Sequence, residues 1–294
     1  MDSVHGDGAC YTLGTLITDQ LACDWLSGYR TCLPRRLQRQ HCLVQRSQRK
    51  ECGLCIHPVA NSNPRSDVGL WQLLRAIAMR DAAKASRLLA ESPRLALDAS
   101  PVGATRASST SYYLKEIEHY VYAGDTALHV TAAAYRTDIA KELVTHGAHV
   151  SARNRRGAQP IHYASVGQPG SEMWDPRAQA GIVAYLLGSG ADPNAADKSG
   201  VTPLHRAVRT RCAAAARVLL ENGADPRRKN GSGSTPLHLA VQNTGRSGSG
   251  SAAASEQQRE IIRLLLDHGA RPGDTDSRGK KVVAELGRSR ITEL

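Results

Sequence analysis

Cysteines near the start of the sequence are the first side chains whose spacing could support chemistry. Cys52 and Cys55 form a Cys-x-x-Cys pair, and Cys42 and His57 are near it. Thiolate and imidazole are the ligands of structural zinc, but such a site normally takes two clusters of ligands at short spacing. The chain has one such pair, and the other cysteines of this segment are 9 to 13 residues apart. We therefore expect no metal and no other cofactor, with Cys42, Cys52, Cys55 and His57 as weak zinc candidates.

Four histidines form a second set of chemically capable side chains. Each ends a five-residue phrase, of which Ser-Thr-Pro-Leu-His at 234–238 is one. They are 33, 43 and 33 residues apart: His129, His162, His205 and His238. Internal repetition of this kind decides the architecture before it suggests a single active site. No nucleophile–base motif, zinc-protease motif or pair of carboxylates stands out elsewhere in the sequence, so we expect that the protein is not an enzyme.

The phrase is typical of a helix start. Thr202 offers a hydroxyl to an unpaired backbone N–H, and the proline after it suits the first helical position. Thr126 and Thr235 stand at the equivalent place, whereas the second unit has Gln159, which predicts a weaker cap. A second helix with apolar residues at helical spacing then runs to a glycine, which ends it in the left-handed conformation. These glycines are Gly147, Gly190, Gly223 and Gly269.

The 33-residue period, the Thr-Pro-Leu-His phrase and the Leu-Leu-x-x-Gly-Ala-Asp ending at 219–225 resemble the ankyrin repeat. The resemblance covers 124–279. It implies an all-α solenoid of stacked helix-turn-helix units with short hairpin fingers, because so short a helix pair cannot bury its apolar face alone. It also implies that the threonine and histidine of the phrase form hydrogen bonds that hold one repeat to the next. The residues in this role are Thr126 with His129, Thr202 with His205 and Thr235 with His238.

The repeat register divides the chain into three parts. We expect 1–67 to be a largely irregular extension, since it lies outside the register and holds six of the seven cysteines. Residues 68–123 are expected to form a capping repeat and a long connector. The array then fills 124–294, with repeats near 124–156, 157–199, 200–232 and 233–278 and a truncated cap at 279–294.

The connector is longer than a finger requires, and it is rich in tyrosine. Four of the nine tyrosines lie between 112 and 122. Tyr113, Ile117 and either Tyr120 or Val121 follow helical spacing there, so we expect an amphipathic helix over 111–122. The rings either cover the joint between the cap and the first repeat or face a partner from an enlarged finger. In the second interpretation Tyr113 and Tyr120 are partner contacts.

The net charge of +11 is concentrated in residues 68–294, which include 30 basic and 21 acidic side chains. Many basic residues fall on the predicted fingers and would form a stripe along one edge. The stripe is either a solvated surface or a binding surface for an acidic protein. Nucleic acid is the weaker alternative, because no recognised nucleic-acid module accompanies the charge. The candidate contacts are Arg155, Arg156, Lys198, Ser199, Arg209, Thr210 and Ser232.

The second and fourth units carry 10 and 13 extra residues between the histidine and the glycine. We expect both insertions at the helix-turn edge, opposite the fingers. The insertion near 242–252 is a Gly/Ser-rich loop that lacks the residues of a phosphate-binding loop. The insertion near 166–176 contains Trp174, which either folds back onto its own repeat or anchors a partner.

These features predict a non-catalytic protein–protein interaction module that binds its partner through the concave surface and the basic fingers. One alternative is a nucleic-acid-associated or zinc-binding protein that uses the N-terminal segment, and another is a secreted effector of the ankyrin type. The N-terminus has no apolar core of a secretory signal, and no stretch approaches the ~20 apolar residues of a membrane span. We therefore expect the protein to lie in the cytoplasm, with secretion as an effector left open. We also expect it to be a monomer.

Overall fold

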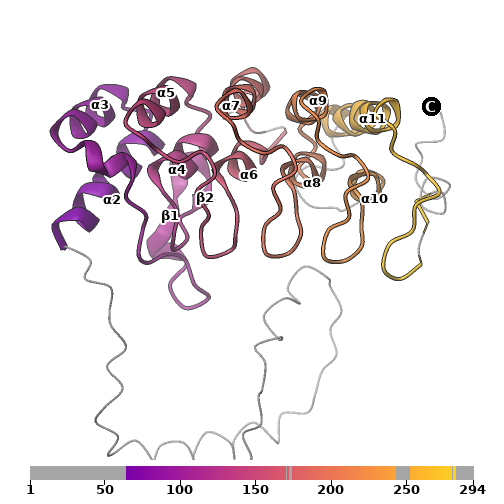
Figure 1. Cartoon of the computed structure of the whole chain (residues 1–294), viewed down its shortest axis with the longest axis horizontal. Helices are drawn as coiled ribbons and strands as arrows, with labels where there is room; N and C mark the ends of the chain where they lie inside the picture. Colours follow the sequence, from indigo (N-terminus) through magenta and orange to yellow (C-terminus); the bar gives the residue numbers. More distant parts are fainter. Residues whose placement is uncertain (1–63, 170, 172–173, 243–251, 280, 283–294) are drawn as a thin grey trace, which may run out of the picture. The chain divides into compact units, whose positions relative to one another are not determined.

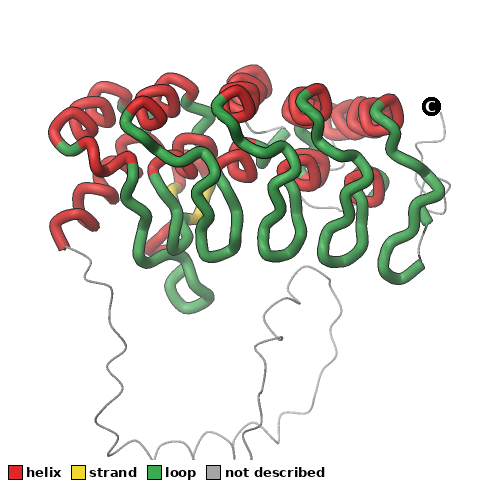
Figure 2. The backbone as a smooth tube through the Cα atoms, in the orientation of Figure 1, coloured by secondary structure: helices red, strands yellow, loops and turns green. Residues whose placement is uncertain are grey.

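The computed structural model describes residues 64–169, 171, 174–242, 252–279 and 281–282. Within them ten α-helices are arranged as five antiparallel pairs in a row, and the loops between pairs extend to one side as fingers (Figures 1 and 2). The pairs are α2 (Pro64–Ala78) with α3 (Ala82–Glu91), α4 (Ala127–Ala133) with α5 (Thr137–Thr145), α6 (Pro160–Ala164) with α7 (Pro176–Gly188), α8 (Pro203–Arg209) with α9 (Ala213–Glu221), and α10 (Pro236–Ala240) with α11 (Ala252–Asp267).

The helices form two layers. The first helices of the pairs, α2, α4, α6, α8 and α10, pack on one another in order, and the second helices, α3, α5, α7, α9 and α11, do the same. The core between the layers is aliphatic, with Leu128, Leu143, Ile161, Ile182 and Leu204 all fully buried. Each pair therefore buries its apolar face against its neighbours, as in a solenoid. The predicted all-α solenoid is confirmed.

Glycines end the second helices as predicted. Gly147, Gly190, Gly223 and Gly269 have φ values of 89°, 95°, 85° and 91°. At the end of α9 the Gly223 N–H bonds the Leu220 carbonyl at 3.1 Å, and the Ala224 N–H bonds the Leu219 carbonyl at 2.9 Å. These bonds satisfy carbonyls that the last helical turn leaves unpaired.

The fingers lie in register because their backbones are hydrogen-bonded. The Lys198 N–H bonds the Arg156 carbonyl at 3.0 Å, and the Gly231 N–H bonds the Ser199 carbonyl at 2.8 Å. Gly200 allows this approach, since a Cβ at that position would lie 2.9 Å from the Gly231 nitrogen. A regular series of finger tips therefore runs along one side of the array.

The connector between the cap and the first repeat is an enlarged finger, which we define as residues 99–126. Its two legs are paired where the Ser100 N–H bonds the Asp125 carbonyl at 2.8 Å and the Ala104 N–H bonds the Val121 carbonyl at 2.8 Å. Between the legs, β1 (Tyr113–Leu114) and β2 (His119–Tyr120) form an antiparallel hairpin. The enlarged finger thus carries a hairpin that lies against the helices of the array.

The amphipathic helix predicted over 111–122 is therefore wrong. Glu118 takes a left-handed conformation, with φ of 48°, which turns the chain back on itself. Leu114 and Val121 are buried while Tyr113 and Tyr120 are exposed, so two of the tyrosines that helical spacing selects do not face the core. Hydrogen bonds between the two legs of the enlarged finger satisfy backbone N–H and C=O groups that a helix would have paired within itself.

Several predictions fall on parts of the chain outside the described residues. These are the irregular extension at 1–63 with its zinc candidates, the Gly/Ser-rich loop at 243–251, and most of the truncated cap, at 280 and 283–294. The domain boundaries proposed from the sequence stay a prediction. In the described part of the chain, no helix is both long enough and apolar enough to cross a membrane.

Candidate functional site

The recurring histidines join adjacent repeats. The Thr126 N–H donates to His129 Nδ1 at 3.1 Å, and His129 Nε2 lies 3.1 Å from the Ala158 carbonyl of the next repeat. Since Nδ1 accepts a backbone N–H, the ring is neutral and its proton on Nε2 donates to that carbonyl. His162 reaches the Val201 carbonyl in the same way, and His205 the Ser234 carbonyl, both at 3.1 Å.

Burial keeps these rings neutral. It lowers the pKa of His129 and of His205, and together with the nearby Arg206 guanidinium it lowers the pKa of His162 to about 3. A neutral imidazole can use one nitrogen as donor and the other as acceptor, which the ladder between repeats requires. The histidines therefore have a structural role, as the repeat resemblance implies.

The threonine hydroxyls complete the motif in three repeats. Oγ1 of Thr126, Thr202 and Thr235 lies 3.0, 2.8 and 2.7 Å from Nδ1 of the histidine three residues later. In the second repeat the Gln159 N–H still bonds His162 Nδ1 at 3.1 Å. The Gln159 Oε1 approaches the first turn as in a capping box, but it is buried without a hydrogen bond to any described residue. This geometry agrees with the weaker cap predicted there.

A buried polar cluster surrounds Asp125 at the base of the enlarged finger. Its carboxylate accepts hydrogen bonds from the Tyr163 hydroxyl at 2.8 Å, from Asn154 Nδ2 at 2.9 Å and from the Tyr122 N–H at 2.7 Å. Burial raises the pKa of Asp125, although these donors favour the carboxylate. The Asp125 and His129 side chains are 0% exposed, so no substrate can reach them. The cluster holds the enlarged finger to the first two repeats.

Two of the predicted contacts, Arg155 and Arg156, also bind residues of the enlarged finger. Arg155 Nη2 donates to the Ala104 carbonyl at 2.5 Å. The Arg156 guanidinium lies 4.9 Å from the centre of the Tyr122 ring, within cation–π range. Both arginines remain exposed at the finger tips, but their charges are not free of internal partners.

Other predicted contacts are exposed on the same side. Lys198 and Ser199 lie at one finger tip, Ser232 lies at the next, and Arg209 is exposed at the end of α8. Arg227 pairs with Asp274 at 3.2 Å, so part of the basic series is neutralised. Among the described residues no ion pair involves Lys198, Arg209, Arg228 or Lys229.

Thr210 and Trp174 are brought together elsewhere, at the helix-turn edge. The Thr210 hydroxyl donates to the Arg206 carbonyl at 2.9 Å and accepts the Gly167 N–H at 3.4 Å. The half-buried Trp174 donates its indole N–H to Gln179 Oε1 at 2.9 Å. Trp174 thus folds back onto its own repeat, and Thr210 lies with it, away from the finger tips.

The tyrosines of the connector lie in two different environments. Tyr112 packs against Trp71 of the cap, with ring centres 5.6 Å apart. Tyr113 and Tyr120 face each other across the hairpin with ring centres 4.8 Å apart, and they are 39% and 38% exposed. Tyr112 covers the joint between the cap and the first repeat, whereas Tyr113 and Tyr120 are exposed, and their role as partner contacts stays a prediction.

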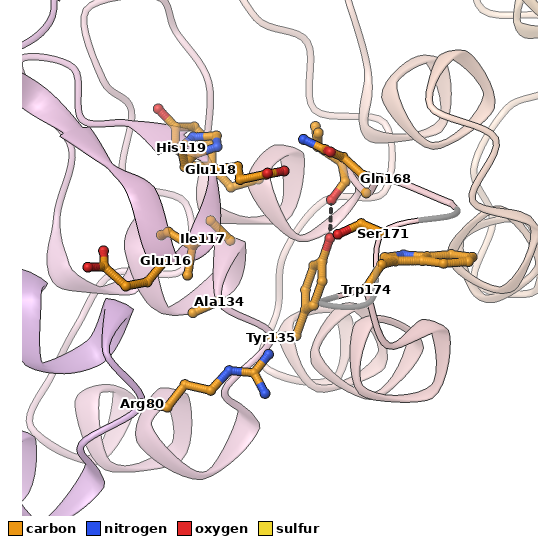
Figure 3. Close-up of a pocket in the computed structure, with 14 residues that line it drawn as sticks. Arg80, Glu116, Ile117, Glu118, His119, Ala134, Tyr135, Gln168, Ser171 and Trp174 are labelled. Carbon is orange, nitrogen blue, oxygen red and sulfur yellow. Dashed lines mark hydrogen bonds between the residues drawn. The ribbon is translucent and has the colours of Figure 1, made fainter. Parts of the chain in front are cut away.

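A small pocket lies between the hairpin and the loop before α7. Figure 3 shows Glu118 and His119 on one side, Gln168 and Trp174 on the other, and Tyr135 between them. The cavity volume is about 70 Å³, far below the ~300 Å³ at which ligand sites begin. Burial and the Arg206 guanidinium lower the pKa of His119 to about 3. In the described residues no group of His, Cys, Asp and Glu is placed to hold a metal ion.

One important residue, Arg206, was missed by the sequence reasoning. Its Nη2 pairs with Asp197 of the adjacent finger at 3.0 Å. Arg206 directly follows the histidine of its phrase, and the equivalent residues of the other repeats are Val130, Tyr163 and Leu239. Aligning the four phrases would have singled out this position, where three repeats have an apolar or aromatic side chain and one has a charge.

Two family models match the chain. One, described as ankyrin repeats (3 copies), matches residues 177–276, and the other, described as ankyrin repeat, matches residues 123–155. A human protein, BCL-6 corepressor-like protein 1, is 34% identical over 90 residues, which are 31% of this chain and 4% of that protein. The chain therefore spans only a small fraction of the length of this relative.

Proposed function

Since this chain belongs to the ankyrin repeat family, we propose that it binds a protein partner through its inner face, formed by the finger tips and the first helices. Ankyrin repeats indicate a protein–protein interaction module. The observation that carries the choice of surface is the series of backbone-linked finger tips, which presents exposed basic side chains at regular intervals.

The proposed partner has an acidic surface. Lys198, Arg228 and Lys229 are exposed and have no carboxylate partner among the described residues. A series of like charges accelerates and orients association with a surface of opposite sign. Arg155, Arg156, Arg209, Ser199 and Ser232 lie on the same face and are proposed contacts, with Tyr113 and Tyr120 as an extension on the hairpin.

The human relative adds nothing more specific. It is named as a corepressor-like protein, but the matched stretch is 4% of its length. A stretch so short carries the repeat architecture and not the activity of the whole protein.

The test is affinity capture with the full chain and two charge-reversed variants. The finger variant changes Lys198, Arg228 and Lys229 to Glu. We expect the finger variant to capture at least tenfold less of a native protein partner than the parent does. Its far-UV circular dichroism spectrum and melting temperature should stay close to those of the parent. Arg155 and Arg156 are left intact because they hold the enlarged finger in place.

The control variant has the same charge change on the opposite side of the array. It replaces Lys84, Arg87 and Lys141, which are exposed on α3 and α5, with Glu. We expect capture by this variant to match that of the parent. Equal capture by both variants would remove the basic fingers from the proposed function.

A further inference from the structure

The residue directly after the histidine of each phrase points to the inner face. In the second repeat Tyr163 donates to Asp125 and receives a hydrogen bond from Asn154 of the adjacent finger. In the third repeat Arg206 pairs with Asp197 of the adjacent finger. Since the repeats are superimposable units, the same position in the other repeats faces this side as well. The four residues are Val130, Tyr163, Arg206 and Leu239.

Exposure at this position changes halfway along the array. Val130 is 0% exposed and Tyr163 is 2% exposed, whereas Arg206 and Leu239 are only partly buried. The inner face is therefore covered over the first two repeats and accessible over the third and fourth.

The enlarged finger is what covers the first two repeats. Its His119 ring lies 4.4 Å from the Tyr163 ring, and its Tyr122 ring receives the Arg156 guanidinium. In Figure 1 the strands β1 and β2 lie beside α4 and α6. Tyr163 is the residue that precedes Arg206 in this series of positions, so the cover ends at the repeat next to that of Arg206.

An incompletely neutralised pair of guanidinium groups stands at this border. Arg206 and Arg209 are three residues apart on α8 and so are neighbours on one face of the helix. Asp197 is the one carboxylate in an ion pair with them among the described residues, and Arg206 Nε is buried without a hydrogen-bond partner. A second carboxylate, supplied from outside, would balance this pair.

The next position along the open half is apolar. Leu239 of α10 is half-buried against the core and keeps part of its side chain exposed. Packed helices are about 8–10 Å apart, and an extended peptide advances about 3.3 Å per residue. Two side chains that are two or three positions apart in an extended peptide can therefore reach α8 and α10 together.

We propose that repeats 3 and 4 recognise a short extended acidic segment of a partner protein. An Asp or Glu side chain pairs with Arg209 beside Arg206, and an apolar side chain two or three positions away packs on Leu239. This inference rests on the proposed function, and it goes further in naming the half of the inner face that is open and the chemistry that it selects.

The test is selection of random dodecapeptides displayed on phage against the immobilised full chain. We expect enriched peptides to carry Asp or Glu with an aliphatic or aromatic residue two or three positions away. A synthetic peptide of the enriched sequence should bind at least tenfold more weakly to Arg209→Glu and to Leu239→Ser. Lys141→Glu, an exposed reversal on α5, should bind it as the parent does, and circular dichroism should show that all variants are folded.

The outcomes separate this inference from the proposed function. Absence of enrichment, enrichment of peptides without an acidic residue, or equal binding to Arg209→Glu would overturn the inference. If the finger variant still loses capture of a native partner in that case, the proposed function stands. If neither the finger variant nor Arg209→Glu changes that capture, both proposals fail.

Discussion

The buried histidine ladder predicts that acid destabilises the array well before its carboxylates are titrated. His162 is fully buried and its pKa is lowered to about 3, whereas an unfolded chain has a histidine pKa of about 6.5. As the pH falls through 6.5 the unfolded state takes up a proton that the folded state takes up only near 3. Stability that is complete above pH 6.5 is therefore lost progressively below it.

The magnitude follows from the two pKa values. At pH 5 the solution is about 1.5 units below the unfolded pKa, and each unit is worth about 1.4 kcal/mol, so His162 alone lowers the free energy of unfolding by about 2 kcal/mol. Burial lowers the pKa of His129 and of His205 as well, so their contributions have the same sign and add to this loss.

Urea unfolding followed by far-UV circular dichroism at pH 7.5 and pH 5.0 measures the effect. His162→Gln removes one titrating group, so the difference between the two pH values should shrink by about 2 kcal/mol even though the variant is less stable at both. His149→Gln removes an exposed imidazole and should leave the difference as in the parent. A pH difference in His162→Gln equal to that of the parent would refute the reasoning.

Two further predictions use the capping and finger geometry. Gly200→Ala and Gly223→Ala both impose a left-handed alanine, at a cost of about 1 kcal/mol, but only at Gly200 does the new Cβ meet the next finger, 2.9 Å from a backbone nitrogen. Thermal unfolding should therefore show a larger loss for Gly200→Ala, and equal losses would argue against close finger packing. Gln159→Thr replaces an unpartnered buried Oε1 with a capping hydroxyl, so it should raise the free energy of unfolding by about 1 kcal/mol. A free energy of unfolding, measured with urea, that is lower than that of the parent would contradict this.

The helix starts and ends were predictable because they depend on local chemistry. A threonine before proline and a glycine after an apolar run act within one or two turns of the chain, and Thr202 and Gly223 do so here. The order of the helix pairs followed from the repeat register, since each unit packs only on its neighbours.

The hairpin was not predictable from spacing alone. Tyr113 and Tyr120 are seven residues apart, which is two turns of a helix, but the same separation also suits facing positions across a tight hairpin. The choice between the two depends on Ala104, which supplies a backbone partner to Val121 from the other leg of the finger. A backbone pairing between residues 17 positions apart cannot be detected from the spacing of apolar residues within a short segment.

The sequence could predict which candidate contacts are charged, but not which of those charges have no partner within the protein. Whether a finger arginine is free depends on a partner in another repeat or in the enlarged finger, as Arg155 and Arg156 show. Arg206 is a different case: its charge stands out when the four phrases are aligned, but its partner Asp197 and its place next to the covered repeats depend on the fold.

The enlarged finger also has a consequence for how the array unfolds. Repeats of a solenoid normally touch only their immediate neighbours, so each boundary is an independent link. Here one segment packs on the cap through Tyr112 against Trp71 and on the second repeat through His119 against Tyr163, which joins units that are not adjacent. We therefore expect the first three helix pairs to unfold as one cooperative block, with amide hydrogen exchange beginning in the third and fourth repeats, where the chain is held by nearest-neighbour links.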